Sequence, residues 1–275
     1  ADASRWPRSW LYRREARGVE RIERRALQAC DGVALVSEAE ARAMGDAGDT
    51  VLAVGNGVDL DYFRPQDRPA AMPPTLVFTG TMDYRPNVEG VCWFGEAIWP
   101  GLKRERPDLR LAIVGRNPAP AVRRLADRPG IEVTGAVPDV RPYLARATVA
   151  VVPLLTARGI QNKVLEAMAM GRAVVASPAA LEGLDVETPA EAIEAQPPEA
   201  WQREILDLLD NDARRRAVEQ GARTCVEHRY TWDSRLRPLV HLCTGRPAAA
   251  ADRTAAQHSH EGPQGQSVHP EAAAS

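Results

Sequence analysis

The sequence predicts a doubly wound α/β domain built on a parallel β-sheet. From residue 75 onward, short runs of Val, Ile and Ala recur without the polar alternation of a half-exposed strand. Such runs are typical of strands that are covered on both faces, as in a parallel sheet. Helical stretches separate the runs, and alternation of strands and helices is the pattern of a doubly wound domain. A composition of 44% hydrophobic and 26% charged residues is ordinary for a globular protein.

Six strands and their connecting helices are expected in this domain. The strands are expected at 75–80, 109–115, 131–135, 148–154, 172–177 and 192–195. Helices are expected at 87–103, 119–127 and 139–146, after the loop around Gly159, and as two polar helices that end near His228.

The residues before the predicted sheet are too few to form a core of their own. A helix is expected at 8–29, a strand at 32–37, a helix at 37–44 and a strand at 50–55, which together make barely two βα units. The segment NGVDLDYF that follows is expected to be a turn and connector.

Residues 245–275 are expected to be disordered. They contain nine alanines and three prolines, but one Val and no Leu, Ile or aromatic residue. Such a segment cannot bury enough apolar surface to offset the entropy lost on ordering.

The charge pattern near the N-terminus has two interpretations. The segment RWPRSWLYRREARGVERIERR is rich in arginine, and a basic stripe can bind nucleic acid or an anionic membrane surface. Its arginines alternate with glutamates, which favours a solvated helix face with (i, i+3) and (i, i+4) pairs. The net charge of the whole chain is −2. We therefore expect no nucleic-acid partner.

Cysteine spacing and apolar runs exclude several classes of protein. The four cysteines lie far apart, with no C-x-x-C pair and no histidine at metal-ligand spacing, which indicates reduced thiols in a cytosolic protein and no zinc site. No apolar run approaches the ~20 residues that a membrane span requires. The chain begins at Ala1 rather than Met, so its true N-terminus is expected to be missing.

The loops after the predicted strands hold the candidate ligand-binding residues, because ligands of open parallel sheets bind outside the carboxyl ends of the strands. Glycines there let backbone amides approach an anion, and Arg or Lys supplies the counter-charge, which suits a diphosphate. No G-x-G-x-x-G follows a strand and no P-loop is present. In chain order, the loop residues are Gly80, Asp83, Arg85, Asn87, Gly115, Arg116, Gly135, Val137, Arg158, Gly159, Asn162 and Lys163.

Glu166, about one turn into its predicted helix, has two interpretations from spacing alone. A carboxylate in the first turn complements the helix dipole, which stabilises a helix by roughly half a kcal/mol. A carboxylate is also a good acceptor for two neighbouring sugar hydroxyls. Spacing by itself favours the first role.

Three motifs in order give the chain a resemblance to a known family. The segments VLAVGNGVD, FTGTMDYRPNVEGV and NKVLEAMAMGRAVVAS look like the C-terminal half of a GT-B retaining glycosyltransferase of the large group 1 class. The pattern ARGIQNKVLEAMAMG resembles the sugar transferases of bacterial exopolysaccharide and PEP-CTERM systems. The resemblance covers about residues 30–243, and YTWDSRL matches the helix with which such proteins cross back to their first domain.

The resemblance implies roles for individual residues in binding a nucleotide-diphosphate sugar. Glu166 matches the glutamate that holds the ribose hydroxyls, and Arg85 and Lys163 match basic positions near the diphosphate. The segment from Gly135 to Val137 matches the part whose backbone meets the base. The remaining positions of the implied donor site are Gly80, Arg158, Gly159, Ile160, Gln161 and Asn162.

Two departures from the family pattern stand out. The class usually carries a second glutamate eight positions before the ribose-binding one, and here that position is Arg158. Either this branch handles the donor sugar differently, or Arg158 contacts phosphate. Furthermore, a GT-B enzyme has two Rossmann-like domains, and only the last βα units of the first are expected here, so the chain looks like a fragment.

The implied organisation has four parts. Residues 1–56 are a remnant of the acceptor-side domain, 57–228 form the Rossmann-like donor-binding domain, 229–244 form a crossover helix and 245–275 a disordered tail. The expected fold class is thus a doubly wound, Rossmann-like C-terminal domain of a GT-B fold with a remnant of the N-terminal domain.

The implied function is transfer of a sugar from a nucleotide-diphosphate donor to a saccharide or lipid-linked acceptor, without a cofactor or a metal. A cytoplasmic bacterial enzyme is implied, with peripheral contact at the inner face of the membrane. A non-catalytic nucleotide-sugar-binding module or inactive fragment is the alternative. A sugar-nucleotide epimerase of the same architecture is a third reading, disfavoured because no suitable carboxylate or histidine pair follows the strands.

Overall fold

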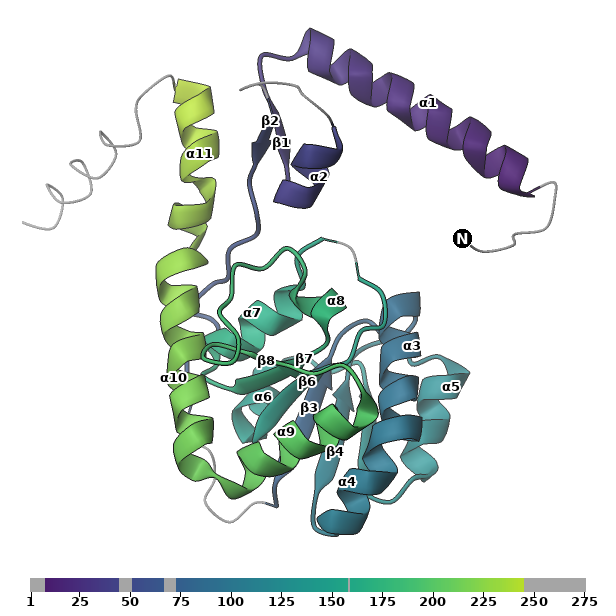
Figure 1. The fold of residues 1–275 in the computed structure, drawn as a ribbon, viewed down its shortest axis with the longest axis vertical. Coiled ribbons are helices and arrows are strands. Elements are labelled where there is room, and N and C mark those ends of the chain that lie inside the picture. The colour runs from purple at the N-terminus through teal and green to yellow at the C-terminus, as the bar shows by residue number, and fades with distance from the viewer. Residues whose placement is uncertain (1–7, 45–50, 67–72, 158, 245–275) are drawn as a thin grey trace, which may run out of the picture. The chain divides into compact units, whose positions relative to one another are not determined.

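A six-stranded parallel sheet is the centre of the structure, a computed structural model that describes residues 8–44, 51–66, 73–157 and 159–244. The strand order is β5-β4-β3-β6-β7-β8, and every neighbouring pair is parallel (Figure 1). The chain therefore starts in the middle of the sheet and winds outward in both directions, which confirms the doubly wound fold class. The strands are β3 (Thr75–Thr79), β4 (Arg110–Val114), β5 (Ile131–Gly135), β6 (Val149–Val152), β7 (Ala173–Ala176) and β8 (Ile193–Glu194).

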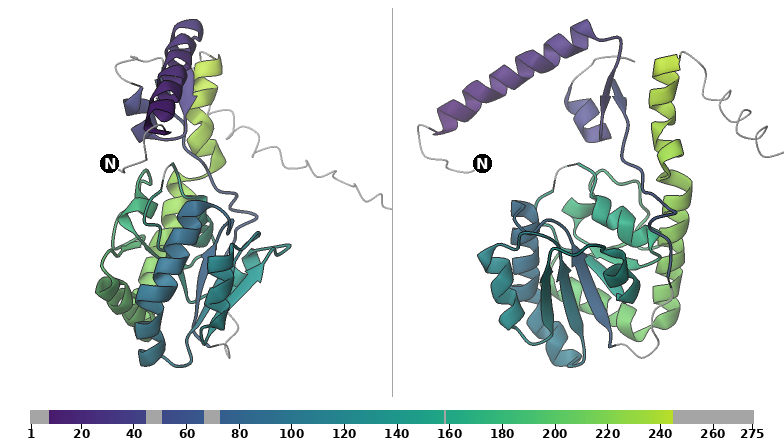
Figure 2. Two further views of the ribbon diagram at one scale, coloured as in Figure 1. Left: turned by 90° about the vertical axis from the view of Figure 1, so that its right-hand side faces the viewer. Right: turned by 180° about the vertical axis from the view of Figure 1, so that it is seen from behind.

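Helices cover the sheet in two groups, which Figure 2 shows from two further directions. One group joins α9 to α4 and to the π-helical turn η2, and the other joins α7 and α10 to each other and to β7. The helical elements are α3 (Arg85–Trp93), η2 (Phe94–Ile98), α4 (Trp99–Glu105), α5 (Pro120–Arg123), the 3₁₀ turn η3 (Arg124–Asp127), α6 (Arg141–Arg146), α7 (Asn162–Ala169), α8 (Pro178–Leu181), α9 (Pro198–Asp210), α10 (Asp212–Arg229) and α11 (Trp232–Thr244).

The predicted helix at 87–103 is in fact three consecutive segments, α3, η2 and α4. It begins two residues earlier than predicted, because Pro86 is tolerated in a first turn, where its missing N–H leaves no hydrogen bond unmade. Pro100 also lies in the first turn of its segment, α4. A proline inside a continuous helix removes one hydrogen bond, and here the widened turn η2 precedes it.

The N-terminal elements form a small two-stranded sheet of their own, with strands and helices near the places that the sequence predicts. Strands β1 (Val33–Leu35) and β2 (Val51–Ala53) pair in parallel, and they are accompanied by helices α1 (Arg8–Ala29) and α2 (Glu38–Ala43). The Ser37 hydroxyl caps α2 by accepting a hydrogen bond from the Glu40 amide, 3.2 Å away.

Burial explains the apolar runs. All four residues of β6 and all four of β7 are buried, so these strands have helices on both faces and no polar alternation. The predicted tail at 245–275 lies outside the described residues, and the domain boundaries at 56, 228 and 244 remain predictions. In the described part of the chain, no helix is both long enough and apolar enough to span a membrane.

The carboxyl ends of the three strands β3, β4 and β5 approach one another through glycines. Gly80 donates to the Val114 carbonyl (3.0 Å), and Gly115 donates to the Gly135 carbonyl (3.2 Å). A Cβ atom added at Gly115 would lie 1.6 Å from the Gly80 carbonyl oxygen. A side chain at Gly115 is therefore incompatible with this backbone.

Replacing Gly115 by Ala tests this contact. The variant should lose at least about 3 kcal/mol of unfolding free energy, because the backbone of two strands must separate to admit the methyl group. Gly183→Ala is the matched control: Gly183 also has a positive φ (+82°), but its Cβ would meet nothing within 4 Å, so its cost should be about 1–2 kcal/mol. Urea denaturation measures both, and equal losses would contradict the close approach.

Candidate functional site

The candidate site lies where the direction of winding reverses. The chain leaves β3 toward β4 on one side of the sheet, whereas β6 pairs with the other edge of β3. The loops that leave the carboxyl ends of β3 and β6 therefore diverge (Figure 1). In open α/β sheets a crevice at this point is the usual place for a ligand.

Lys163 lies at this switch point, in the first turn of α7, and the group of residues around it is called here the β3–β6 crevice. Its Nζ donates hydrogen bonds to Asn87 Oδ1 (2.9 Å) and to Gln161 Oε1 (3.4 Å). It also lies 5.5 Å from the centre of the Phe78 ring at the end of β3. Asn87 in turn donates from Nδ2 to the Thr81 carbonyl at 2.9 Å. The lysine is thus fixed between the first turns of α3 and α7.

Gly80 makes room for this arrangement. A Cβ atom at Gly80 would lie 2.7 Å from Asn87 Nδ2 and 3.4 Å from Lys163 Cε. Any larger residue would push the Asn87 amide away from the lysine. The predicted site residues Gly80 and Lys163 are therefore brought together, with Asn87 between them.

Glu166 follows Lys163 by three residues, so both side chains project from the same side of α7. Burial lowers the pKa of Lys163 from 10.5 to about 8, and the charge of Glu166 partly opposes this change. Burial raises the pKa of Glu166, and the charge of Lys163 partly opposes that. Two oppositely charged groups that are both costly to ionise are typical of sites built to receive a charged or polar ligand.

The loop that leads into α7 has a glycine in the left-handed region. Gly159 has φ +66°, and its carbonyl accepts a hydrogen bond from Gln161 Nε2 at 3.2 Å. Asn162 Oδ1 accepts a hydrogen bond from Asn56 Nδ2 at 2.9 Å, and the half-buried Ile160 packs against the core. The predicted contact Arg158 lies outside the described residues.

Gly135 and Val137 lie at the end of β5, two strands from β3. Gly135 has φ +70°, and nothing occupies the space within 4 Å of where its Cβ would be. Val137 is half-buried and packs against the core. The surface at Gly135 is thus open to a flat group, whereas Val137 contributes mainly packing.

Arg85 lies in a different environment from Lys163. It begins α3, its side chain is 86% exposed, and its Nε donates to Glu89 Oε1 at 2.6 Å. It lines a cavity of about 660 Å³ together with Leu155, Ala157 and Glu182. The two predicted cations therefore belong to two groups of residues, one around Asn87 and one beside the loop after β6.

Asn87 is one of the loop candidates of the sequence, and its burial and its bond to Lys163 now give it a role. Two other residues near Lys163, Phe78 and Asn56, were not predicted as site residues. In the sequence, Phe78 is indistinguishable from an ordinary core residue of a strand. Asn56 lies in the motif VLAVGNGVD, whose resemblance to the family is the one sequence signal that points to it. Within the described ranges, no three His, Cys, Asp or Glu side chains gather into a metal site.

The lowered pKa of Lys163 predicts a specific pH dependence of stability. The folded-state pKa of about 8 lies below the ordinary value of 10.5, so between these values the unfolded chain binds more protons. Unfolding free energy should therefore rise with pH across this window, by up to about 3 kcal/mol, relative to a Lys163→Met variant. Urea denaturation of both proteins from pH 7.5 to 10 measures the difference. Parallel curves would show that Lys163 is not desolvated.

Comparison with known proteins bears on this arrangement. Residues 73–211, just over half of the chain, match the family described as "Glycosyl transferases group 1". No curated protein matches the sequence.

Solved structures share the fold. The HepE protein of Anabaena, solved in complex with UDP and glucose, superposes with a TM-score of 0.65 at 15% identity over 80% of this chain and 65% of its own. Sucrose-phosphate synthase from Thermosynechococcus elongatus gives 0.63 at 20% identity over 87% and 61%. The C-terminal domain of a group 1 glycosyl transferase (LpcC) from Francisella tularensis gives 0.54 at 18% identity over 64% and 99%.

The chain spans less than two thirds of the Anabaena and Thermosynechococcus proteins, but nearly the whole of the isolated Francisella domain. At these identities the similarity shows a shared fold, that of the C-terminal, Rossmann-like domain of a GT-B glycosyltransferase. The family match goes further, because it covers the β3–β6 crevice and the helix that carries Lys163 and Glu166. The chain belongs to the group 1 glycosyltransferases.

Proposed function

We propose that this chain binds a nucleotide-diphosphate sugar and takes part in transferring its sugar, with retention at the anomeric carbon, to a saccharide or lipid-linked acceptor. The observation that carries the proposal is the desolvated pair Lys163 and Glu166 at the β3–β6 crevice. The Anabaena neighbour was solved with UDP and glucose, and TarM from S. aureus with UDP and a sugar derivative. These complexes support a donor of the same chemical class here.

Glu166 is proposed to hold the ribose. An ionised carboxylate accepts hydrogen bonds from two neighbouring hydroxyls without needing a donor of its own. Burial strengthens such bonds, because water does not compete for them. The positive charge of Lys163 opposes the effect of burial on the Glu166 pKa and so helps to keep the carboxylate ionised.

Lys163 is proposed to bind the diphosphate. A diphosphate brings the negative charge that the buried lysine lacks, so binding stabilises the protonated amine. The amides from Gly159 to Asn162 precede α7, and amides at a helix N-terminus bind anions. Arg85 and Arg158 are proposed as further cations for the phosphates. Gly80 and the segment from Gly135 to Val137 are proposed to meet the nucleotide through their backbone.

These groups fit the chemistry of sugar transfer. The bond between the anomeric carbon and the diphosphate oxygen breaks, and its electron pair leaves with the diphosphate. The acceptor hydroxyl gives its proton to the leaving diphosphate and forms the new bond on the same face. Cations near the leaving diphosphate stabilise the charge that develops there, which removes the need for a metal or cofactor in the proposal.

The motif resemblance supports the finer parts of the proposal. NKVLEAMAMG and GTMDYRPN resemble the sugar transferases of exopolysaccharide systems, so we propose a role in exopolysaccharide synthesis in the bacterial cytoplasm. The arginine-rich α1 suits peripheral contact with an anionic inner leaflet.

A nucleotide panel tests donor binding. One of UDP, GDP, ADP and TDP should raise the unfolding free energy by about 2.7 kcal/mol at roughly 100 times its dissociation constant, because it binds the native state alone. Glu166→Gln should lose most of this stabilisation. Glu199→Gln, on the exposed surface of α9, is the matched control and should keep it. The proposal fails if no nucleotide stabilises the parent, or if both variants respond alike.

The affinity for the selected nucleotide should fall at high pH. Lys163 is protonated below its pKa of about 8 and neutral above it. Between pH 7.5 and 9.5 the protonated fraction of the free lysine falls roughly twenty-five-fold, and affinity should fall by several-fold up to this factor, the more so the further binding raises the pKa. Lys163→Arg keeps its charge in this range, so its affinity should change far less. Calorimetric titrations at both pH values measure the two affinities. Equal losses of affinity in the parent and in Lys163→Arg would show that titration of Lys163 is not the cause.

A further inference from the structure

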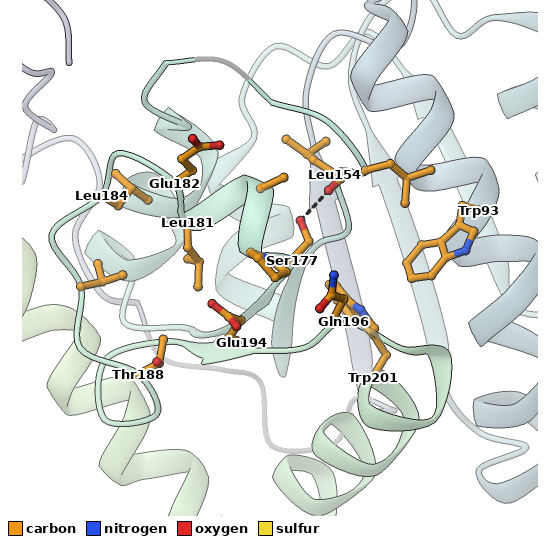
Figure 3. A pocket seen from close by; sticks show the side chains of 14 residues that line it. Trp93, Leu154, Ser177, Leu181, Glu182, Leu184, Thr188, Glu194, Gln196 and Trp201 are labelled. Carbon is orange, nitrogen blue, oxygen red and sulfur yellow. Dashed lines mark hydrogen bonds between the residues drawn. The ribbon is translucent and has the colours of Figure 1, made fainter. Parts of the chain in front are cut away.

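One cavity is separate from the Lys163 crevice. It has a volume of about 680 Å³, within the range of roughly 300–1,000 Å³ that ligand pockets occupy. Figure 3 shows its walls, which come from α3, the loop after β6, α8, the end of β8 and α9. Neither Lys163 nor Glu166 lines it.

The charged residues that line this cavity make it unsuited to the anionic ligands proposed for the crevice. Glu182 and Glu194 line it, and no Lys, Arg or His is among its described lining residues. A phosphate or another anion would meet two carboxylates without a counter-charge. The cavity is therefore suited to a neutral or positively charged ligand.

Two tryptophans give the cavity an apolar wall with one unused donor. Trp93 and Trp201 pack edge to face, with ring centres 6.2 Å apart and planes at 80°. Trp201 is completely buried, and its Nε1 has no hydrogen-bond partner. A buried donor without a partner is rare and costly. In Figure 3 the Gln196 amide lies beside this indole, at the side of the cavity.

The polar groups of the wall include both hydrogen-bond acceptors and a hydrogen-bond donor. The carboxylates of Glu182 and Glu194 accept hydrogen bonds, whereas the Trp201 indole donates one. Ser177 is already satisfied, because its hydroxyl donates to the Leu154 carbonyl at 2.6 Å and accepts from the Ala180 amide at 3.3 Å. An amine would satisfy the carboxylates but not the indole. Hydroxyl groups both donate and accept, and a sugar ring also offers a C–H face to an indole.

The cavity continues toward the proposed donor site. It shares Leu155, Ala179 and Glu182 with the second cavity, the one that Arg85 lines. That second cavity reaches Ala157, two residues before Gly159. The two cavities are thus neighbours, and the second one borders the loop before α7.

We infer that the 680 Å³ cavity binds an uncharged saccharide unit of the acceptor or of the growing glycan. The naming of this glycan as acceptor rests on the proposed function. Trp93 packs against the sugar ring, and Glu194 and Glu182 accept hydrogen bonds from its hydroxyls. The indole N–H of Trp201, which is buried in the free chain, donates to a further hydroxyl when the bound sugar displaces the side chain that covers it. The acceptor is then at least partly saccharide, held by the donor-side domain itself.

Saturation-transfer NMR with disaccharides tests the inference on this chain. Maltose, cellobiose, gentiobiose and chitobiose are the neutral probes, and at least one should bind. A glucuronate-containing disaccharide and spermidine are the anionic and amine comparators, and neither should bind here. Glu194→Gln should weaken the bound disaccharide about tenfold, as expected for loss of a hydrogen bond to a charged group. Trp93→Phe, which keeps an aromatic ring, should weaken it as well, whereas Glu199→Gln should leave it unchanged.

The outcomes separate this inference from the proposed function. Glu166→Gln should bind the disaccharide normally, since Glu166 does not line the cavity. If a nucleotide stabilises the chain but no neutral disaccharide binds, the saccharide site is wrong and the donor site stands. The same conclusion follows if spermidine or the glucuronate sugar binds as well as the neutral disaccharides. If a disaccharide binds at Glu194 and no nucleotide stabilises the chain, the saccharide site stands and the donor site is wrong.

Discussion

The candidate site depends on one interaction, the hydrogen bond by which Asn87 holds the buried ammonium of Lys163. This bond joins residues 76 positions apart, across the point where the sheet reverses its winding. It requires Gly80 to have no side chain, and it requires β3 and β6 to be neighbours. Glu166, one turn along α7, completes a pair of opposite charges kept away from water. The surrounding sheet and helices hold this pair at the switch point of the sheet, where the proposed diphosphate and ribose would bind.

The choice of lysine at this position has a physical reason. Of the 35 basic residues in the sequence, only Lys103 and Lys163 are lysines. An arginine stays charged at any pH that a protein meets, and its planar group needs several partners. A lysine is a compact charge that two amide oxygens can hold, and burial moves its pKa close to neutrality. Burial thus disfavours the protonated form of Lys163 while no ligand is bound, and a bound anion would stabilise it. This is the behaviour expected of the proposed diphosphate site.

The sequence predicts the sheet well because its central strands β3, β4, β6 and β7 are almost wholly buried, and such burial leaves a continuous apolar run. It does not predict the division of the helix at 87–103, where the effect of Pro100 depends on packing around η2. Loop positions at strand ends identify Gly80 and Lys163, but they do not give side-chain directions. For that reason Asn87 is a loop candidate without an assigned role, and Arg85 is grouped with Lys163 although it lines a cavity that Lys163 does not line. The pair of Trp93 and Trp201 is invisible in the sequence, because the two residues meet only after the chain has folded.

Selective ¹³C labelling of lysine, with Lys103→Arg to assign the resonances, allows the most direct measurement of the central claim. The Lys163 ε-carbon is followed from pH 6.5 to 10.5, without ligand and with each nucleoside diphosphate in turn. We expect a Lys163 pKa of about 8 in the free chain, because the side chain is buried, and a pKa above about 9 once a diphosphate binds. If Lys163 titrates near the ordinary lysine value of about 10.4 and no nucleotide moves it, the crevice is not a diphosphate site.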